Sequence, residues 1–298
     1  MKIGITGATG FLGKHATHRL LGQGHQVAAW CRDIDAIKTD DSIQWIQGRL
    51  GDDRATQALV KDCDAIVHAG LYQPGSSFVG GEGDPVAYLE TNIIGSLKLL
   101  EAAFQHGVDR FIFVSTGAVH DRVAEDRPLD EKHPLWPSSF YGAYKASVET
   151  LVHTYGFSGM LSCCTLRPTS IYGAAEPIED SKWYDMISDV AAGKDVQATG
   201  GSKSVHVSDV AAAIDLLLQT DQPVRGETFN CTDRMISHFE VAQIAKAVSG
   251  SSSVISGQPK EAKRTMDTSK IEALGMKFGG TAILESTIRQ ILGLGQDS

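Results

Sequence analysis

The glycine spacing behind the first apolar segment constrains this chain more than any other feature. Residues 2–6 (KIGIT) predict a strand, and three glycines follow at three-residue spacing before a helix expected at 15–21. Glycine lets the backbone approach a pyrophosphate, whose charge the amino end of the helix stabilises. In this strand-to-helix position the spacing predicts a dinucleotide-binding loop of Gly7, Thr9, Gly10, Phe11, Leu12 and Gly13. The alternative is a tight strand–helix turn that binds nothing.

The first 120 residues alternate short apolar strands with amphipathic helices. Further strands are expected at 26–31, 43–47, 65–68 and 110–115, and further helices at 56–61 and 85–106. The segment RFIFVS (110–115) is almost continuously apolar, as a parallel strand buried on both faces is. The alternation predicts an α/β fold, a Rossmann-type doubly wound parallel sheet.

The second half of the chain is less regular. Helices are expected at 141–155, 210–219, 239–248 and 282–292, and strands at 161–167 and 228–231, the last returning to the main sheet. Residues 173–204 look polar and irregular. We therefore expect a dinucleotide-binding core at 1–172 plus about 205–231, and a smaller discontinuous C-terminal substrate lobe at 173–204 plus 232–298.

Composition excludes several classes of protein. The net charge of −9 argues against nucleic acid as a partner. Nothing resembles a signal peptide, and no apolar run approaches the roughly 18 residues that span a bilayer. Five cysteines without a C-x-x-C spacing indicate neither disulfides nor zinc, and the ten histidines show no metal-ligand spacing. We expect a cytoplasmic protein with a small-molecule substrate, no metal, and no membrane or nucleic-acid partner.

The end of the second expected strand bears on cofactor choice. An acidic residue about 20 residues after the glycines would bind the ribose hydroxyls of NAD. This chain has Cys31-Arg32-Asp33 there, and Arg32 suits a 2′-phosphate. NADP is therefore favoured over NAD. Alternatively, Arg32 is a solvated charge and Asp33 binds the ribose of NAD.

A tyrosine and a lysine share one face of an expected helix. Tyr141 and Lys145 are four residues apart, and Ser115 and Thr116 end the buried strand before them, at the sheet edge where ligands bind. Lowering a phenol pKa by three units needs about 4 kcal/mol, which an adjacent ammonium and an oxidised nicotinamide can supply. Tyr141 would transfer the proton, Lys145 would activate it and bind ribose, and Thr116 would orient the reacting oxygen. The alternatives are an exposed tyrosine and a strand-end cap.

Motifs spread over most of the chain carry a family resemblance. They are TGATGFLG (6–13), CDAIVHAG (63–70), Asn92 in its helix, FVSTGAVH (113–120), YGAYK (141–145), LRPTSIYG (166–173), VHVSDVAAAI (205–214) and GETFN (226–230). In this order they resemble the extended short-chain dehydrogenase/reductases of the NAD-dependent epimerase/dehydratase type. The resemblance implies Thr116, Tyr141 and Lys145 as the catalytic trio, a substrate-binding tail, and a homodimer through the two long helices. It also implies cofactor contacts from Leu50, Ala69, Gly70, Leu71, Asn92, Ser115, Tyr141, Lys145, Pro168 and Ile171.

Departures from the family pattern bear on the reaction. Gly117-Ala118 stand where dehydratases of this family have Asp-Glu, which disfavours dehydration, and Ser170 stands where nucleotide-sugar epimerases commonly have asparagine. Arg49 replaces an acidic residue on the adenine side, which again favours NADP.

The substrate-side candidates are Thr116, Ser170, Trp183, His206 and Arg234. Arg234 would pair with an anion, Trp183 lies in the family's substrate loop, and His206 precedes an expected helix cap at Ser208-Asp209. Local structural roles are the alternatives for each.

These observations predict an NAD(P)-dependent oxidoreductase that transfers hydride to or from a carbonyl or hydroxyl carbon of a small polar or sugar-like substrate. A nucleotide-sugar 4-epimerase is the first alternative. A non-catalytic NADP-sensing regulator is the second, and the intact trio argues against it.

Overall fold

The computed structural model describes residues 1–37 and 42–295, and its contacts divide the chain into two units. Unit 1 comprises Met1–Pro168, Ala211–Cys231 and Asp267–Met276, and unit 2 comprises Thr169–Val210, Thr232–Met266 and Lys277–Ser298. The expected lobe included all of 232–298, of which 296–298 lie outside the described residues. The structure instead groups Asp267–Met276 with unit 1, where the main-chain N–H of Asp267 donates to the carbonyl oxygen of Leu129.

Unit 1 is built on a seven-stranded sheet in the order β10-β6-β5-β4-β1-β2-β3, with every pairing parallel. The strands are β1 (Lys2–Thr6), β2 (Gln26–Cys31), β3 (Ile43–Gln47), β4 (Ala65–His68), β5 (Arg110–Val114), β6 (Cys163–Pro168) and β10 (Glu227–Cys231). This confirms the predicted doubly wound α/β fold and the return of the 228–231 strand to the main sheet. The carboxyl ends of all seven strands therefore share one edge.

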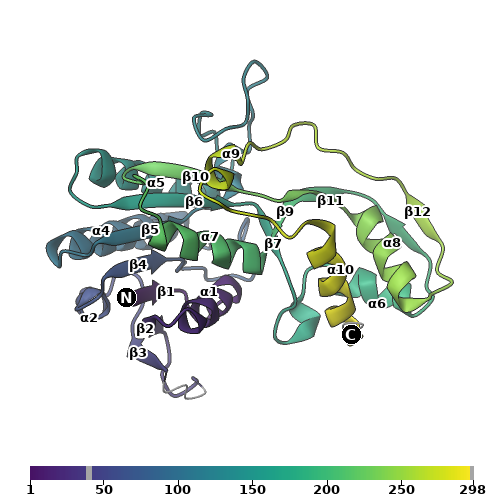
Figure 1. Cartoon of the computed structure of the whole chain (residues 1–298), viewed down its shortest axis with the longest axis horizontal. Coiled ribbons are helices and arrows are strands. Elements are labelled where there is room, and N and C mark those ends of the chain that lie inside the picture. Colours follow the sequence, from purple (N-terminus) through teal and green to yellow (C-terminus); the bar gives the residue numbers. More distant parts are fainter. Residues whose placement is uncertain (38–41, 296–298) are drawn as a thin grey trace. The chain divides into compact units, whose positions relative to one another are not determined.

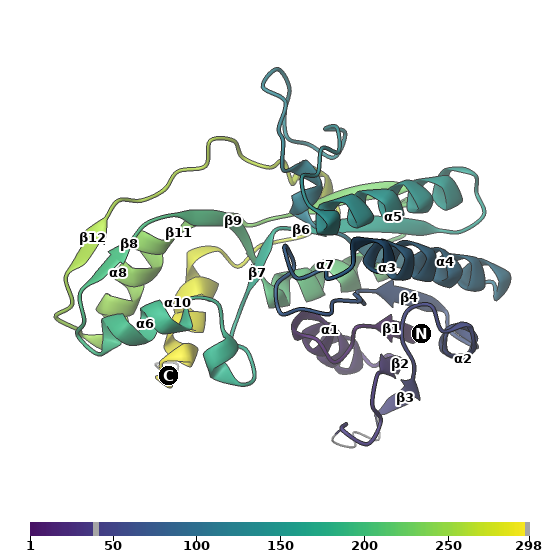
Figure 2. The ribbon, with the colours of Figure 1, turned by 180° about the vertical axis from the view of Figure 1, so that it is seen from behind.

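Helices cover both faces of this sheet (Figures 1 and 2). α2 (Asp53–Val60), α4 (Gly95–Gln105) and α5 (Phe140–Phe157) lie on one face, and α1 (Phe11–Gly22) and α7 (Val207–Gln219) lie on the other. The core beneath α2, α4 and α5 includes Leu59, Leu99, Val148 and Phe111, each without exposed surface. A short α9 (Ser269–Glu272) packs near β10.

The long helix predicted at 85–106 is interrupted by a π-helical turn. It consists of α3 (Pro85–Leu89), the π turn η1 (Glu90–Ile94) and α4. The prediction missed the turn because apolar periodicity does not register one extra residue, whereas π turns are frequent at functional sites. Asn92 lies inside this turn and is completely buried.

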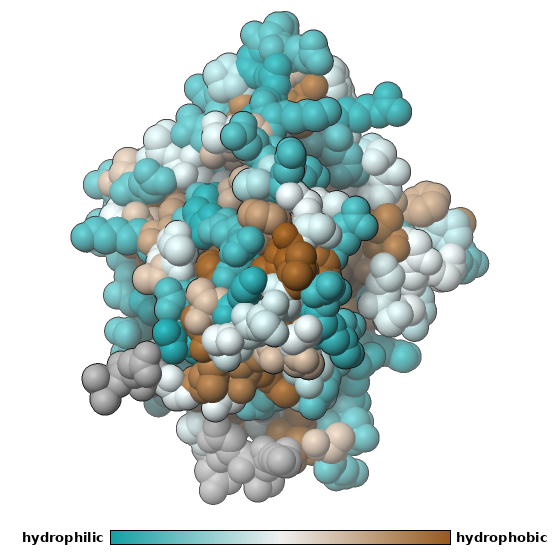
Figure 3. All heavy atoms as spheres, turned by 90° about the vertical axis from the view of Figure 1, so that its right-hand side faces the viewer, coloured by the Kyte–Doolittle hydropathy of each residue, from teal (hydrophilic) through white to brown (hydrophobic). Residues whose placement is uncertain are grey.

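Unit 2 contains two small sheets. β11 (Arg234–Ser237), β9 (Gly201–His206) and β7 (Ser170–Tyr172) form one, and β12 (Ile255–Gly257) pairs with β8 (Val196–Ala198) in the other. The helical elements are η3 (Ile178–Asp180), α6 (Tyr184–Ala191), α8 (His238–Ser249) and α10 (Gly280–Ile291). The prediction that 173–204 is irregular was wrong, because these elements are too short to show a period. Figure 3 views the molecule from the right-hand side of Figure 1 and shows a mostly hydrophilic surface with separate hydrophobic patches.

Within residues 1–37 and 42–295, no helix has both the length and the apolar character needed to cross a membrane.

Candidate functional site

The loop between β1 and α1 has the geometry of an anion site. α1 begins at Phe11 with Gly10 as its N-cap, without a side-chain cap and without an acidic residue in the first turn. Its first main-chain N–H groups therefore remain available to a negatively charged group. A Cβ atom at Gly10 would meet only the carbonyl oxygen of Gly7, at 3.3 Å, so the space in front of this glycine is open.

The other two loop glycines are required by the fold itself. Gly7 has a φ of 76°, and a Cβ atom there would lie 2.8 Å from the Ala69 backbone. At Gly13 a Cβ atom would lie 2.0 Å from the carbonyl oxygen of Gly7. These contacts bring β1, α1 and the end of β4 close together, so the loop fits a bound pyrophosphate.

The residues predicted to select the cofactor lie at the end of β2 and after β3. Arg32 and Arg49 are exposed, and Leu50 is buried. Asp33 accepts the main-chain N–H of Asp35 at 3.0 Å, so one of its oxygens is engaged in a local turn.

A buried hydrogen-bond chain fixes the segment after β4. The Ser96 hydroxyl donates to the carbonyl oxygen of Asn92 at 2.6 Å, so it accepts from Nε2 of His68 at 2.8 Å. Nδ1 of His68 then accepts from the Thr6 hydroxyl at 2.7 Å, and Thr6 accepts the main-chain N–H of Gly70 at 2.9 Å. Burial lowers the pKa of His68 to about 3, which agrees with a neutral ring.

Asn92 fixes the same segment from its other end. Its Oδ1 accepts the main-chain N–H of Tyr72 at 2.9 Å, and its Nδ2 donates to the carbonyl oxygens of Tyr72 and Tyr88 at 2.9 and 3.0 Å. The amide thus holds residues 69–72 in place, and we infer that Asn92 positions the predicted cofactor-lining residues Ala69, Gly70 and Leu71.

Thr116, Tyr141 and Lys145 gather at the carboxyl end of β5. Thr116 follows directly after the Ser115 that ends this edge, and its side chain lies near enough to Tyr141 to lower the pKa of that phenol. Nζ of Lys145 donates to the carbonyl oxygen of Val114 at 2.6 Å. Gly142 allows this approach, because a Cβ atom there would lie 2.8 Å from the carbonyl oxygen of Ala118. Sequence-distant groups of the predicted trio therefore meet at one sheet edge.

Burial disfavours the charged forms of Tyr141 and Lys145. Burial raises the pKa of Tyr141, and hydrogen bonding by the Thr116 side chain partly offsets this increase. Burial also lowers the pKa of Lys145 to about 7. A phenolate at Tyr141 thus needs added positive charge nearby, which a charged Lys145 and an oxidised nicotinamide would provide.

Glu149, one helical turn beyond Lys145, was not singled out in the sequence analysis. It forms a buried ion pair with Arg167 at 2.6 Å and accepts a short hydrogen bond from the Ser115 hydroxyl. Ser115 is only 3% exposed, so its hydroxyl serves this internal network. The sequence could have pointed to Glu149, because Tyr141, Lys145 and Glu149 follow one another at four-residue spacing on one helix face.

The predicted substrate residues other than Thr116 lie in unit 2. Ser170 on β7 is exposed and pairs in register with Ser204 of β9. Arg234 is bound by both carboxylate oxygens of Glu240, at 3.0 and 2.7 Å. Its charge is therefore already compensated. Pro168 ends β6 in a buried position, and Ile171 is half-buried on β7.

His206 caps the helix that follows it. α7 begins at Val207, so the N-cap expected at Ser208-Asp209 was wrong. Nδ1 of His206 accepts the main-chain N–H of Ser208 at 3.2 Å and lies 2.7 Å from its hydroxyl. Its ring also contacts Tyr172, with 5.1 Å between centroids.

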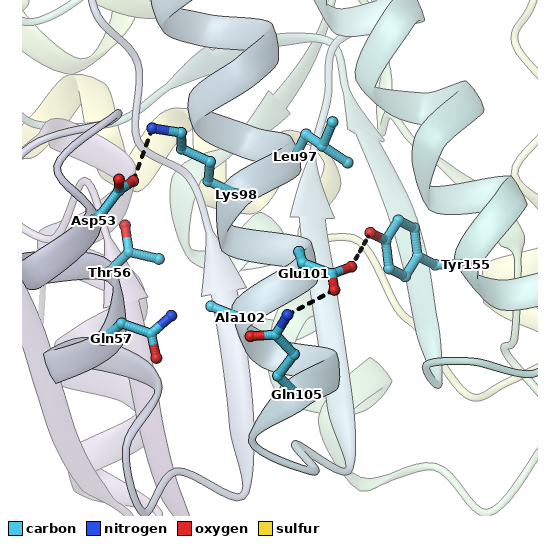
Figure 4. Close-up of a pocket in the computed structure, with 9 residues that line it drawn as sticks. All are labelled: Asp53, Thr56, Gln57, Leu97, Lys98, Glu101, Ala102, Gln105 and Tyr155. Atoms are coloured by element: carbon cyan, nitrogen blue, oxygen red, sulfur yellow. Dashed lines mark hydrogen bonds and ion pairs between the residues drawn. The ribbon is translucent and has the colours of Figure 1, made fainter.

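A surface pocket of about 420 Å³ lies on α2, α4 and α5 (Figure 4). Its polar groups pair with one another: Lys98 with Asp53 at 2.8 Å, and Glu101 with Tyr155 at 2.6 Å. Tyr155 follows Tyr141 by 14 residues on α5, a distance of about 21 Å along a helix. This pocket is therefore separate from the trio.

A doubly wound sheet with an uncapped glycine loop and a Thr-Tyr-Lys trio defines a dinucleotide-dependent enzyme. Residues 3–232 match the model of the NAD dependent epimerase/dehydratase family, and the chain belongs to this family. It is thus an NAD(P)-dependent enzyme with oxidoreductase chemistry.

Proteins similar to this chain have names that describe different reactions. A dTDP-glucose 4,6-dehydratase of Streptomyces antibioticus is 27% identical, covering 77% of this chain and 71% of the relative. A ketoreductase of Stigmatella aurantiaca that acts on 4-hydroxy-2-methyl-3-oxo-4-farnesyl-3,4-dihydroquinoline-1-oxide is 28% identical over 78% of this chain and 68% of its own length. The crystal structure of Thermus thermophilus UDP-glucose 4-epimerase with NAD has a TM-score of 0.78 at 24% identity, covering 98% of this chain and 99% of that one.

Proposed function

We propose that the chain is a dehydrogenase or reductase acting on the carbonyl or hydroxyl carbon of a small polar or sugar-like substrate. The observation that carries the proposal is the meeting of Thr116, Tyr141 and Lys145 at the end of β5. Similarity to a ketoreductase supports net redox turnover.

Each member of the trio has a distinct task. A dinucleotide held by the glycine loop would supply the hydride chemistry. Tyr141 Oη exchanges a proton with the substrate oxygen, and the Thr116 hydroxyl orients that oxygen. Lys145, as an ammonium, stabilises the phenolate form of Tyr141 against its burial. Gly7, Gly10 and the N-terminus of α1 hold the pyrophosphate.

Tyr141→Phe tests the proposal. It removes the proton-transferring hydroxyl and should lower kcat about 100-fold or more, while the affinity for the cofactor stays unchanged. Tyr155→Phe, about 21 Å along the same helix, is the control. Unchanged turnover in Tyr141→Phe would overturn the mechanism.

A nucleotide-sugar 4-epimerase is the second candidate, supported by similarity to UDP-glucose 4-epimerase. The two candidates differ in redox balance. A dehydrogenase assayed with a panel of alcohols and sugars accumulates NADH or NADPH, whereas an epimerase regenerates its cofactor in each turnover. Dehydration is disfavoured, although a dTDP-glucose 4,6-dehydratase is among the similar proteins, because Gly117–His120 form a 3₁₀ turn without a carboxylate directly after Thr116.

Two observations favour different cofactors. The exposed Arg32 and Arg49 support NADP, whereas the Thermus thermophilus epimerase is a complex with NAD, which supports NAD. We retain NADP as the prediction from this chain's own charges. Tighter binding of NADP than NAD, lost in Arg32→Ala, is the expected result, and tighter NAD binding by the unsubstituted chain would contradict it.

We also propose a homodimer through α4 and α5 with the segments that flank them. Large apolar side chains exposed there are Ile94, Phe104, Phe140 and Phe157. A dimer would bury them, as apolar patches at protein interfaces are buried. Light scattering at micromolar concentration should give twice the chain mass, and Phe104→Glu should shift it toward the monomer.

The cytoplasm is the proposed compartment, supported by the buried thiols of Cys31, Cys63, Cys163 and Cys164. Cell fractionation with a compartment marker tests it.

A further inference from the structure

The 3₁₀ turn η2 (Gly117–His120) connects Thr116 to the rest of the chain. The Thr116 side chain caps this turn by accepting the main-chain N–H of Ala118 at 3.2 Å. The turn also packs against the start of α5, because a Cβ atom at Gly142 would lie 2.8 Å from the carbonyl oxygen of Ala118. A displacement of η2 would therefore move Thr116 relative to Tyr141.

His120, the last residue of η2, anchors the other end of the turn. It is buried, its Nδ1 lies 3.2 Å from the carbonyl oxygen of Pro134, and its Nε2 lies 3.1 Å from Nη1 of Arg167. A carbonyl oxygen only accepts and a guanidinium only donates, so the ring carries its proton on Nδ1 and accepts at Nε2. Burial and the charge of Arg167 lower the pKa of His120 to about 4, which agrees with a neutral imidazole.

His133 is bound in the same way from the segment that faces η2. Its Nδ1 donates to the same Pro134 oxygen at 2.9 Å, and its Nε2 accepts the main-chain N–H of Ala124 at 2.9 Å. The rings of His120 and His133 meet edge to face, with 5.1 Å between their centroids. Two imidazoles thus donate to one carbonyl oxygen, which has a lone pair for each of them, and this fixes Pro134 against η2.

Arg167 connects His120 to the buried carboxylate of Glu149. Its Nε and Nη2 donate to the two oxygens of Glu149 at 3.0 and 2.6 Å, and its Nη1 donates to His120 and to the carbonyl oxygen of Glu131 at 3.2 Å. The side chains of His120, Arg167 and Glu149 are all buried. Without the imidazole, a buried N–H of the guanidinium would lose its acceptor, which is costly in a protein interior.

We propose that His120 is a positioning residue for the reaction: by accepting from Arg167 it holds η2, and through η2 it holds Thr116 beside Tyr141. The proposal rests on the proposed function, because Thr116 orients the substrate oxygen only in that mechanism. The required feature is the lone pair on Nε2. A different side chain that still accepts from Arg167 should therefore replace the imidazole.

Two substitutions of His120 separate the acceptor from packing. His120→Gln can keep an acceptor for Arg167 in its amide oxygen, whereas His120→Leu has none. With the substrate that the panel of alcohols and sugars identifies, kcat should fall about tenfold or more in His120→Leu, while KM for the cofactor changes less than about twofold. His120→Gln should bring kcat back to within about threefold of the unsubstituted chain.

His153→Leu is the matched control. His153 is a partly buried histidine on α5 whose Nε2 lies 3.0 Å from the Thr228 hydroxyl, and it follows Tyr141 by 12 residues, about 18 Å along a helix. The same substitution there removes a hydrogen bond without touching η2. It should leave kcat unchanged.

Nitrogen-15 NMR of the full chain with labelled histidine, at pH 7, tests the hydrogen bonds of His120 without turnover. The ring signal that disappears in His120→Gln should be that of a neutral imidazole protonated at Nδ1. A charged ring, a proton on Nε2, unchanged kcat in His120→Leu, or equal losses of kcat in His120→Gln and His120→Leu would overturn the positioning role. Unchanged turnover in Tyr141→Phe would instead overturn the proposed mechanism, so the two failures give different results.

Discussion

Nζ of Lys145 donates a 2.6 Å hydrogen bond to the carbonyl oxygen of Val114, the last residue of β5. The ammonium also lies over the rings of Phe113 and Tyr144, at 4.7 and 5.0 Å. Its side chain is thus fixed in an apolar, water-poor setting. Burial there lowers its pKa to about 7, although the negative charge of Glu149 raises it in part.

This pKa predicts how the stability of the cofactor-free protein depends on pH. The folded state loses the Lys145 proton near pH 7, whereas the unfolded chain keeps it to about pH 10.4. Between these values the unfolded state binds more protons, so raising the pH stabilises the fold by at most about 1.4 kcal/mol per unit. Urea unfolding between pH 7 and 8.5 should show this increase.

Lys145→Met isolates that contribution. Without the buried amine, the increase between pH 7 and 8.5 should become smaller, with the remainder coming from Lys182, whose pKa burial lowers to about 8. The stability at pH 7 should rise, because the Lys145 charge is no longer desolvated on folding. The same increase in both proteins would show that Lys145 titrates normally in the folded state.

Loss of the buried Glu149–Arg167 pair should lower the free energy of unfolding more than loss of an exposed ion pair. Glu149→Gln leaves the guanidinium of Arg167 buried without its counter-ion, which costs about 3–5 kcal/mol. Asp189→Asn breaks the exposed pair with Lys194 and should cost far less, because solvent screens that pair. Urea denaturation of both variants measures the difference, and equal losses would contradict the buried ion pair.

The sequence predicted unit 1 better than unit 2 for a physical reason. The predicted bounds of β1, β2, β3 and β4 agree with the structure. Buried strands such as β2 and β4 are nearly continuously apolar, and the edge strand β3 shows apolar residues among glutamines. In unit 2 the strands β7 and β8 have three residues each, too few for a period. The π turn around Asn92 stayed hidden because apolar periodicity does not register one extra residue in a helix.

Some residues of the candidate site could also be predicted from the sequence and others could not. Loop glycines and a Tyr-Lys pair are local patterns, so their spacing reveals them. The surroundings of Ser170 have no local pattern, because Ser170 and Ser204 come together only through the pairing of β7 with β9. Arg234 appeared free in the sequence, and only the fold pairs it with Glu240.

Two neighbouring glycines should respond differently to substitution. Gly10→Ala meets little within the protein and should change stability by less than about 1 kcal/mol, yet its methyl group enters the space left for the pyrophosphate. We expect the Kd for the cofactor to rise at least tenfold. Fluorescence titration measures that Kd, and a thermal melt measures stability.

Gly13→Ala and Gly22→Ala complete this comparison. Gly13→Ala should destabilise the fold by about 2 kcal/mol or more, because its Cβ atom would lie 2.0 Å from a carbonyl oxygen. Gly22→Ala, at the other end of α1, meets no atom within 4 Å and should change neither property appreciably. Unchanged cofactor affinity in Gly10→Ala would contradict the assigned loop.

Phe78 should contribute to turnover although it contributes little to stability. It lies on a glycine-rich loop, is 62% exposed, and has its ring centroid 5.5 Å from that of Tyr141. Such an aromatic contact is worth about 0.5–1.5 kcal/mol, and Phe78 also shields Tyr141 from water. Phe78→Ala should therefore lower kcat/KM by about threefold to tenfold, with the free energy of unfolding lowered by about 1.5 kcal/mol at most. Val254→Ala, which also truncates an exposed apolar side chain (61%), should leave kcat/KM unaltered. Steady-state kinetics and urea unfolding of the two variants decide this, and equal kcat/KM values would show that the loop leaves Tyr141 unaffected.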